Sequence, residues 1–221
     1  MGENDFSRDD IRAMRRSYGD AGLEQLDADP FVAFADWLRQ AHENPMIVEA
    51  NAMVLSTLGT DSMISTRTVL LKDISEGGFT FFTNYSSRKA HAMESNEHVS
   101  LLFPWYAMER QVSIQGVVAR TSQQESEDYF STRPWASQIG AWASHQSSPL
   151  SSREELEQRY AGAAAKWPEG VTVPCPPHWG GYRVVPLTIE FWQGRYSRLH
   201  DRLRYERPDT SANWELNRYY P

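Results

Sequence analysis

Two cations that flank a strand-like segment are the first residues in this sequence that could do chemistry. Arg67 and Lys72 enclose Thr, Val and Leu residues in Arg67-Thr68-Val69-Leu70-Leu71-Lys72. Such charges are most often solvated at a sheet edge. The segment nevertheless spans about 16 Å, comparable with the length of a flavin mononucleotide, so one cation could hold a phosphate while the other reaches a ring. The two positions have opposite parity, so a bulge or strong twist between them is required.

A second cationic group lies in Thr83-Asn84-Tyr85-Ser86-Ser87-Arg88-Lys89, at the start of a predicted helix. Hydroxyls beside Arg88 and Lys89 can bind an anion there, because free backbone amides, the helix dipole and formal charge act together. An ordinary capped helix with exposed cations would give the same pattern. Both interpretations stay open on these residues alone.

The third group comprises Tyr129, Arg133 and Ser137. Tyr129 and Arg133 are one helical turn apart and share a helix face. Ser137 follows Pro134 and is expected to cap the next helix, so three phosphate-binding groups could converge where two helices meet. A surface Arg beside a half-buried Tyr is the commoner outcome for such a triplet.

The fourth group begins at Trp192-Gln193-Gly194 and continues in Arg198-Leu199-His200-Asp201-Arg202. On a strand, Arg198, His200 and Arg202 would share one face, with Leu199 and Leu203 on the other. Three potentially cationic groups on one face repel each other unless something anionic or acidic lies opposite. This pattern therefore indicates a binding surface more strongly than any single residue does.

Several common kinds of chemistry are absent from the sequence. It contains no Gly-x-Gly-x-x-Gly and no Gly-x-x-x-x-Gly-Lys-Ser/Thr motif, which excludes the usual dinucleotide and phosphate-loop sites. The histidines lack ligand spacing, and the single cysteine, Cys175, cannot build a zinc site. The net charge of −7 argues against a general nucleic-acid or membrane-surface binder. If the protein is an enzyme, its catalysis must then depend on a bound organic cofactor or on the positioning of the substrate.

The expected location follows from the same composition. One cysteine allows no intramolecular disulfide, which favours a reducing compartment. Residues 1–10 are polar and acidic, and no run of about 18 apolar residues occurs that could act as a membrane span. We therefore expect a soluble, cytoplasmic protein.

The elements that position the four groups follow from hydrophobic spacing and turn signals. Asp29-Pro30 is typical of a helix start and predicts a helix over residues 30–43. Other helices are predicted over residues 87–95, 122–132, 137–144 and 152–167, and a short one near 9–18. Strands are predicted over residues 52–58, 64–72, 79–83, 99–105, 111–120, 182–192, 199–205 and 214–219. The chain is thus mainly β with peripheral helices (α+β), and its antiparallel sheet is expected to close on itself.

Taken in order, these segments resemble the pyridoxine/pyridoxamine 5′-phosphate oxidase family from about Met14 to Pro221. The resemblance is carried by Arg67–Lys72, Phe82–His91, Leu101–Trp105, Glu109–Val112, Ser137–Trp142, Trp179–Arg183 and Phe191–Gly194 through Arg198–Arg202. Each motif is moderately specific, and together they are highly specific. One departure is Phe82, which stands where a Tyr is common in the family.

The resemblance implies an FMN-binding split β-barrel, antiparallel and Greek-key-like, that forms a homodimer with FMN at the subunit interface. Residues 29–221 would be a single FMN-binding domain, and residues 1–28 a mobile segment that closes over the substrate. The implied FMN-binding residues are Arg67, Thr68, Val69, Leu70, Leu71, Lys72, Phe82, Thr83, Arg88, Lys89, Gln111, Gln146, Ser147, Trp192 and Arg202. The implied substrate-binding residues are Arg15, Tyr18, Lys72, Tyr129, Arg133, Ser137, Arg198 and His200, the last two also catalytic.

The activity that the resemblance implies is oxidation of pyridoxamine and pyridoxine 5′-phosphate to pyridoxal 5′-phosphate, with dioxygen as acceptor and hydrogen peroxide as product. No metal, nucleic acid or membrane is expected to take part. Two alternatives remain: a split-barrel flavin or deazaflavin reductase, and a non-catalytic carrier of pyridoxal phosphate or flavin. The substrate-side residues Tyr129, Arg133, Ser137, Arg198 and His200 separate them, because a reductase has no need of a second phosphate site.

Overall fold

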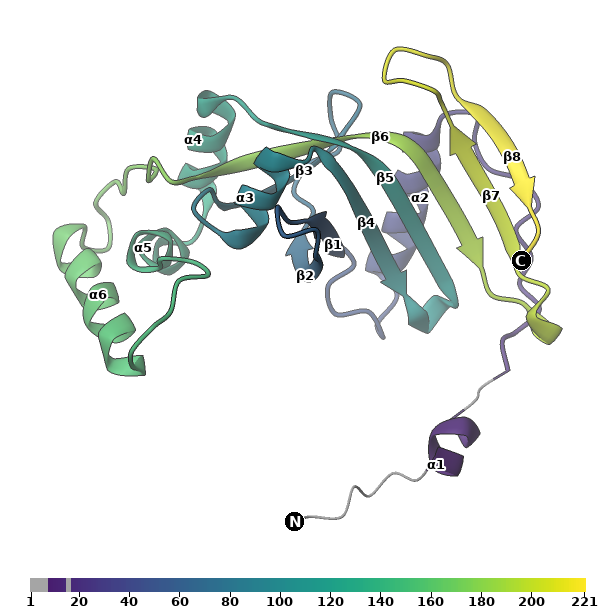
Figure 1. The fold of residues 1–221 in the computed structure, drawn as a ribbon, viewed down its shortest axis with the longest axis horizontal. Coiled ribbons are helices and arrows are strands. Elements are labelled where there is room, and N and C mark those ends of the chain that lie inside the picture. The colour runs from purple at the N-terminus through teal and green to yellow at the C-terminus, as the bar shows by residue number, and fades with distance from the viewer. Residues whose placement is uncertain (1–7, 15–16) are drawn as a thin grey trace.

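The computed structural model describes residues 8–14 and 17–221. Its eight strands form one antiparallel sheet, in which β2, β1, β4, β5, β6, β7 and β8 are neighbours in that order and β3 pairs with β6 (Figure 1). The strands are β1 (Ala52–Leu58), β2 (Ile64–Leu70), β3 (Phe79–Asn84), β4 (His98–Trp105), β5 (Arg110–Arg120), β6 (Trp179–Gln193), β7 (Asp201–Glu206) and β8 (Glu215–Tyr219).

The helices surround this sheet, as the sequence predicts. They are α1 (Arg8–Ala13), α2 (Pro30–Glu43), α3 (Arg88–Ser95), α4 (Gln123–Thr132), α5 (Trp135–Ala143) and α6 (Arg153–Lys166). The helices α4, α5 and α6 gather beyond the end of the sheet where β6 begins (Figure 1). None of the helices in the described part of the chain is both long and apolar enough to cross a membrane.

Helix α2 begins and ends where its sequence signals place it. The Asp29 side chain accepts a hydrogen bond from the Phe31 amide, and Pro30 occupies the first helical position. The apolar face of α2 covers the sheet: the Phe34 ring lies 4.9 Å from the rings of both Phe79 and Phe103. Alternation along β4 and β5 turns every second side chain into this same core.

β6 is the longest strand and holds the sheet together. Its first half pairs with β3 and its second half with β7, while β5 follows it along the other side. The β5–β6 register shifts between Gln115 and Gly116, opposite Pro186. A Cβ at position 116 would lie 2.2 Å from the Val185 carbonyl oxygen, so only glycine fits there. The shift also lets a proline sit inside a central strand, where it would otherwise cost a ladder hydrogen bond.

The strand ladders stop short of a closed barrel. Beyond Leu70 the chain leaves the β1 ladder, and the Lys72 amide donates to the Thr80 carbonyl at 2.8 Å. The Thr80 amide in turn donates to the Asp73 carbonyl at 2.9 Å. This isolated bridge joins the end of β2 to β3, and no continuous ladder between these two strands is seen in the described residues. The predicted antiparallel sheet is confirmed, whereas its full closure is not.

Two boundary predictions are wrong, and both concern site residues. Helix α5 begins at Trp135 with Pro134 as its N-cap residue, so Ser137 lies inside the first turn and does not cap the helix. Strand β7 begins at Asp201, so Arg198 and His200 lie in a turn and not on a strand face with Arg202. The cause is local: Ser197 and Arg198 have φ values of 58° and 63°, which no strand can contain. Leu199 is accordingly exposed, whereas Leu203 is buried, so the two do not share a strand face as predicted.

The aromatic contact between α2 and the sheet generates a stability prediction. Phe34 is fully buried, so Phe34→Ala should lower the free energy of unfolding by about 3–5 kcal/mol through lost burial and the cavity left behind. Val32→Ala on the exposed side of the same helix should cost no more than about 0.5 kcal/mol. Urea denaturation followed by tryptophan fluorescence measures both. Equal losses for the two variants would contradict the packing described for α2.

Candidate active site

A cleft of about 670 Å³ runs beside β2, between this strand and helices α4 and α5. This volume is in the range of small-molecule sites, about 300–1,000 Å³. The cleft is lined by Arg67, Thr68, Val69, Leu70, Lys72, Phe82, Thr83, Asn84, Lys89, Tyr129, Arg133, Ser137, Gly140, Ala141, Ser144, Gln146 and Trp179. Twelve of the sequence-predicted site residues are therefore brought together here.

The position of β2 at the sheet edge explains how both Arg67 and Lys72 reach this cleft. Their opposite parity predicts a bulge or strong twist, but the β1–β2 register runs unbroken from Leu58↔Ile64 to Ala52↔Leu70. No bulge interrupts this register between Arg67 and Leu70. β2 is an edge strand, and consecutive residues of an edge can border one cleft because the cleft runs along the strand and not over one of its faces. Lys72 lies past the end of β2, where the chain has changed partner from β1 to β3.

Arg67 and Lys89 form the first cationic pair of the cleft. The buried Lys89 ammonium donates to Gln146 Oε1 at 2.6 Å and to Thr83 Oγ1 at 3.1 Å. Arg67 donates to the Leu55 carbonyl at 3.1 Å and to Thr57 Oγ1 at 2.9 Å. Neither cation forms an ion pair within residues 8–14 and 17–221, so both remain available for an anion.

The pKa values of Arg67 and Lys89 also reflect the absence of a carboxylate partner for either cation. Burial, together with the charge of Arg67, lowers the pKa of Lys89 to about 8. Burial, together with the charge of Arg88, lowers the pKa of Arg67. A half-buried Arg67 beside a buried Lys89, with no carboxylate partner for either, is unfavourable in the ligand-free protein and becomes favourable once a dianion lies between them. The arrangement fits a phosphate group.

Arg133 is the cation of a second group, where α4 meets α5. Its guanidinium lies 4.7 Å over the Trp179 ring, and its buried Nη1 atom has no hydrogen-bond partner. Burial lowers the pKa of Arg133, against smaller opposing effects of Tyr129 and Cys175. A buried donor without a partner is rare in folded proteins. With Tyr129 and Ser137 lining the same cleft, Arg133 offers a second anion-binding position.

Aromatic rings form one wall of the cleft beside Arg133. Phe82 stacks on Tyr129 with ring centroids 4.1 Å apart and an interplanar angle of 21°. Phe82 also stacks on Trp179 at 5.4 Å and 11°. The ring of Phe82, where the family often has Tyr, thus contributes packing that needs no hydroxyl.

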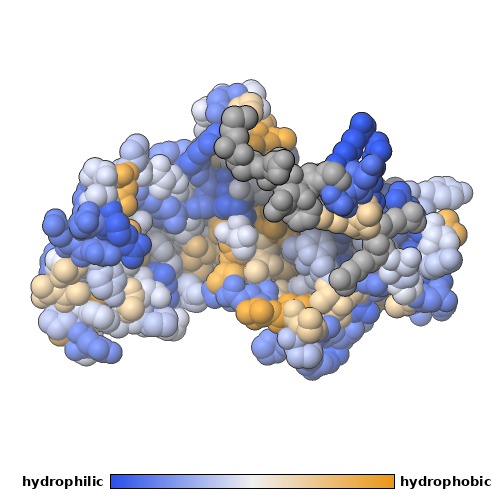
Figure 2. Space-filling model, turned by 90° about the horizontal axis from the view of Figure 1, so that it is seen from below, coloured by the Kyte–Doolittle hydropathy of each residue, from blue (hydrophilic) through white to orange (hydrophobic). Residues whose placement is uncertain are grey.

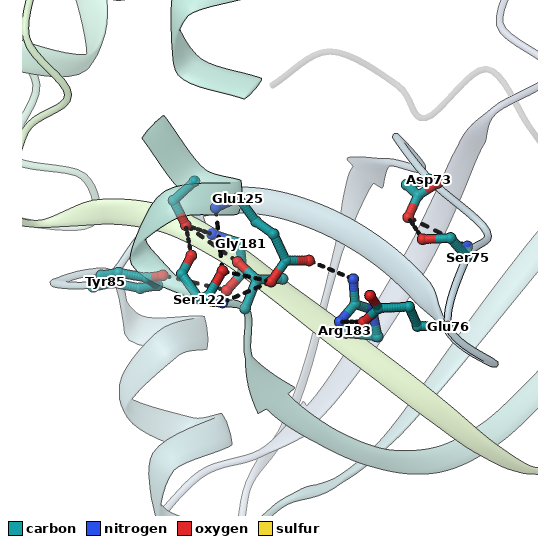
Figure 3. Close-up of polar contacts among 10 residues, drawn as sticks. Asp73, Ser75, Glu76, Tyr85, Ser122, Glu125, Gly181 and Arg183 are labelled. Atoms are coloured by element: carbon teal, nitrogen blue, oxygen red, sulfur yellow. Dashed lines mark hydrogen bonds and ion pairs between the residues drawn. The ribbon is translucent and has the colours of Figure 1, made fainter. Parts of the chain in front are cut away.

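Arg183 fixes the start of α4 to the sheet and to the loop after β2 (Figure 3). Its guanidinium pairs with Glu76 at 2.7 Å and with Glu125 at 2.5 Å. Glu125 also forms the capping box of α4 with Ser122. Because α4 carries Tyr129 near its far end and Arg133 directly after it, this network helps to set the second anion-binding position.

A separate group of predicted site residues lies at the other end of β6. Gln111, Trp192 and Arg202 are direct neighbours in one row across β5, β6 and β7. The Arg202 guanidinium is oriented by Glu190, which it contacts at 2.8 and 3.2 Å, and by the Tyr220 carbonyl. Trp192 lies 4.6 Å from the His200 ring, centroid to centroid.

The turn that carries Arg198 and His200 is held by its own backbone. Arg195 N–H donates to His200 Nδ1 at 3.0 Å, so a neutral His200 carries its proton on Nε2. Arg198 and Ser197 hold left-handed backbone conformations, which are costly outside glycine and concentrate at functional sites. Arg198, His200 and Tyr18 line a second cavity, of about 610 Å³.

Four predicted site residues lie outside the main cleft for other reasons. Leu71 is in the core, and Asn51 binds both its backbone amide and its carbonyl. Arg88 points to Asp61 at 3.5 Å, although its charge still reaches Arg67. Ser147 follows Gln146 in a turn with φ of 73° and does not line the cleft. Arg15 lies outside the described residues.

Sequence reasoning missed five residues that line the cleft. They are Asn84, Gly140, Ala141, Ser144 and Trp179. The small residues follow Ser137 at helical spacing, which is a readable signal of a helix face open to a ligand. Trp179 belongs to the segment Trp179–Arg183, but nothing in its sequence neighbours indicates that its ring lies against the Arg133 guanidinium.

The fold and cleft define a class: an antiparallel β protein whose small-molecule cleft holds two groups of uncompensated cations. Residues 40–166 match the family model described as pyridoxamine 5′-phosphate oxidase. Residues 179–221 match the model described as the pyridoxine 5′-phosphate oxidase C-terminal dimerisation region. The chain belongs to the pyridoxine/pyridoxamine 5′-phosphate oxidase family.

Individual relatives agree with this assignment. A pyridoxine/pyridoxamine 5′-phosphate oxidase of Streptomyces avermitilis is 50% identical over 218 residues, covering 96% of each chain. That of Burkholderia vietnamiensis is 49% identical over 211 residues, 94% of this chain and 97% of the relative. Among solved structures, PhzG from Burkholderia lata in complex with tetrahydrophenazine-1-carboxylic acid has a TM-score of 0.81 at 31% identity, covering 88% of this chain and 94% of its own. An FMN-binding protein from Nostoc punctiforme, 14% identical, shares the fold with a TM-score of 0.70 and covers 89% of this chain and 100% of its own.

The lowered pKa of Lys89 generates a pH prediction. Lys89 is charged below about pH 8 and loses its proton as the pH rises through that value, so a phosphate ligand should bind more weakly in alkaline solution. Using FMN as the probe, we expect the Kd to rise roughly tenfold between pH 7 and pH 9.5. Fluorescence titration measures it. Lys89→Arg keeps its charge in this range and should flatten the profile; an equally steep profile in this variant would contradict the assignment.

Proposed function

We propose that the protein oxidises pyridoxamine 5′-phosphate and pyridoxine 5′-phosphate to pyridoxal 5′-phosphate, using FMN as cofactor and dioxygen as electron acceptor and releasing hydrogen peroxide. One observation carries the proposal: a single cleft contains two separate groups of uncompensated cations, Arg67 with Lys89 and, at the α4–α5 corner, Arg133. A phosphorylated cofactor and a phosphorylated substrate bound side by side would need both. The family assignment and the names of the relatives support the same reaction.

FMN fits the half of the cleft that borders β2. Arg67 and Lys89 would hold its phosphate, with Arg88 adding charge from outside the lining. The edge of β2 over residues 67–70 would lie along the ring system and supply free backbone groups for it. When bound, FMN supplies the hydride acceptor for the reaction and passes the electrons to dioxygen.

The substrate phosphate would bind at Arg133, Tyr129 and Ser137, with Lys72 closing the site from the end of β2. Holding the phosphate uses binding energy away from the reacting carbon to orient that carbon, which is how remote contacts accelerate a reaction. The Phe82 and Trp179 rings give this half of the cleft an apolar wall. Such a wall excludes water from the pyridine ring.

A second copy of the chain would complete the site. Trp179 lines the cleft, whereas Trp192, on the same strand, belongs to the row with Gln111 and Arg202. Thirteen residue-to-residue steps along the strand place these two tryptophans roughly 43 Å apart if β6 is straight. One ligand cannot span that distance, so we infer a homodimer in which the row of one copy faces the cleft of the other.

The surface and the family model support this dimer. The C-terminal dimerisation region spans β6, β7 and β8, which carry Trp192 and Arg202. Large apolar side chains such as Met46, Val48 and Ile64 are exposed in the single chain. Figure 2 shows hydrophobic residues gathered near the middle of one face between hydrophilic regions. An exposed apolar patch of this kind is typical of an interaction surface.

Arg198 and His200 would act on the substrate from the second copy. Arg198 is the residue we expect to position the substrate and to stabilise charge that develops during hydride transfer. His200 assists from beside Trp192, with its Nε2 proton free to donate because Nδ1 is already bonded to Arg195. Tyr18 covers the same group from the N-terminal segment.

Other functions in this family of folds would use the cleft differently. A flavin or deazaflavin reductase, or a flavin carrier, has no need of the Arg133 group. The structure of PhzG is a complex with tetrahydrophenazine-1-carboxylic acid, a compound without a phosphate group. The unpartnered Nη1 of Arg133 therefore favours an anionic substrate over a flavin carrier or reductase. The names of the relatives favour a phosphate as that anion.

Oxygen consumption with pyridoxamine 5′-phosphate tests the proposal directly. A yellow purified protein that consumes dioxygen with this substrate, but not with unphosphorylated pyridoxamine, is the expected result. Dioxygen uptake that is equal for both compounds would contradict the second phosphate site. A colourless protein that cannot be reconstituted with FMN would sink both the oxidase and the reductase interpretations.

Two substitutions should separate cofactor binding from turnover. Arg198→Ala should lower kcat by roughly a hundredfold or more while the Kd for FMN changes little, because Arg198 acts on the substrate. Arg67→Ala should do the reverse, weakening FMN chiefly. Steady-state kinetics at saturating FMN and a parallel FMN titration measure both effects. Loss of flavin from the Arg198 variant, with turnover per bound FMN unchanged, would show that the assignment is wrong.

A further inference from the structure

Asp201 is the common hydrogen-bond acceptor for three segments that are distant in sequence. Its Oδ2 accepts the Leu23 amide at 2.9 Å and pairs with Arg195 Nη1 at 3.3 Å. Its Oδ1 pairs with Arg218 Nη1 at 2.6 Å. One carboxylate at the start of β7 thus binds the N-terminal arm (residues 17–27), the Arg198 turn and β8.

Arg195 and Arg218 also contact the arm directly. Arg195 Nη2 pairs with Asp20 at 3.1 Å. Arg218 Nη2 donates to the carbonyls of Leu23 and Glu24 at 2.9 and 3.0 Å. Without the Asp201 charge, both guanidinium groups would lose the partner that orients them. The carboxylate therefore governs most of the polar contacts between the arm and this end of the sheet.

The charge state of Asp201 is suited to this task. Its side chain is largely buried, and burial raises its pKa, but the Leu23 amide and the charges of Arg195 and Arg218 outweigh burial and lower the pKa overall. The carboxylate is consequently ionised throughout the neutral range. The contacts of Asp201 with the arm should therefore be independent of pH in the neutral range.

The arm held in this way places Tyr18 over the proposed catalytic group. The Tyr18 ring meets the rings of Trp192 and His200 edge-on, at 5.7 and 5.5 Å. A Cβ at Gly194 would lie 2.9 Å from the Tyr18 ring, so the ring packs directly on the backbone before the Arg198 turn. The Gly19 carbonyl also accepts the Tyr196 amide at 3.0 Å. The conformation of the arm and that of the turn are therefore coupled through these contacts.

We propose that Asp201 is a positioning residue that latches the N-terminal arm, so that Tyr18 and His200 enclose the substrate from one side. This inference rests on the proposed function for the identity of the substrate. The latch itself is a contact between Asp201 and the arm, which is present without substrate and is open to measurement without turnover.

Hydrogen exchange of the substrate-free protein tests the latch. Asp201→Asn keeps the size of the side chain and removes the charge, so amides in residues 17–27 should exchange about tenfold faster or more. Strands β4 and β5 should keep their protection, which shows that the variant is folded. Asp209→Asn is the matched control, because Asp209 also accepts backbone amides, from Ser211 and Ala212, but touches no part of the arm. Unchanged protection of the arm in Asp201→Asn would overturn the latch.

Arg218→Met supplies a second variant with the same expected direction, since it removes the bonds to the Leu23 and Glu24 carbonyls. Faster exchange of the arm in this variant supports the relay through Arg218. Protection equal to that of the unaltered protein would contradict it, even if Asp201→Asn failed to fold.

Kinetics then connect the latch to the active site. Asp201→Asn should raise KM for pyridoxamine 5′-phosphate about tenfold and leave the Kd for FMN unchanged. Tyr18→Ala should raise KM similarly, and the double variant should be no worse than Tyr18→Ala alone, because both act through one contact. If the increase in KM of the double variant equalled the product of the two single increases, the mechanism would be wrong. A protein that oxidises no pyridoxamine 5′-phosphate would refute the proposed function, while the exchange result would still decide the latch.

Discussion

The continuous pairing of β6 with its neighbours is the constraint on which the rest of the structure depends. This one strand pairs with β5 along most of its length, with β3 at its start and with β7 at its end. It therefore fixes the cleft beside Trp179 and the row beside Trp192 at opposite ends of a single rigid element. A strand of fifteen residues cannot fold back to bring its own ends together. The division of the site into two halves, and the proposed dimer, are consequences of that rigidity.

Positive charge without a carboxylate partner is the second feature that shapes the cleft. Arg67, Lys89 and Arg133 lie in or beside buried surroundings without carboxylate partners in the described part of the chain. Such charges destabilise the ligand-free fold, because desolvation is not offset by an ion pair. Outside the cleft, other arginines form ion pairs, as Arg183 does with Glu76 and Glu125. The contrast is what we expect if the cleft gives up stability for the proposed anion binding.

Local signals in the sequence were sufficient for most individual elements. The Asp29 helix start, the helix predicted from residue 122 and the strands predicted over residues 99–105 and 111–120 depend on signals within a few residues, and the structure confirms these elements. The two failures have a common cause. A proline at position 134 and left-handed conformations at positions 197 and 198 are backbone properties that hydrophobic spacing does not report. Both failures fall at proposed site residues, where backbone strain is most common.

The sequence by itself determined the types of residue available for binding, the elements that carry them and, through its motifs, the family. It could not determine which of those residues share a cleft. Arg67 and Lys72 reach the same cleft because β2 lies at an edge of the sheet, and edge position depends on pairings between segments far apart in the chain. Gln111, Trp192 and Arg202 form a row because of register across three strands, and Asp201 reaches Leu23 across 178 positions of sequence. Only the tertiary structure decides such contacts, because their energies depend on distances in space that no local pattern encodes.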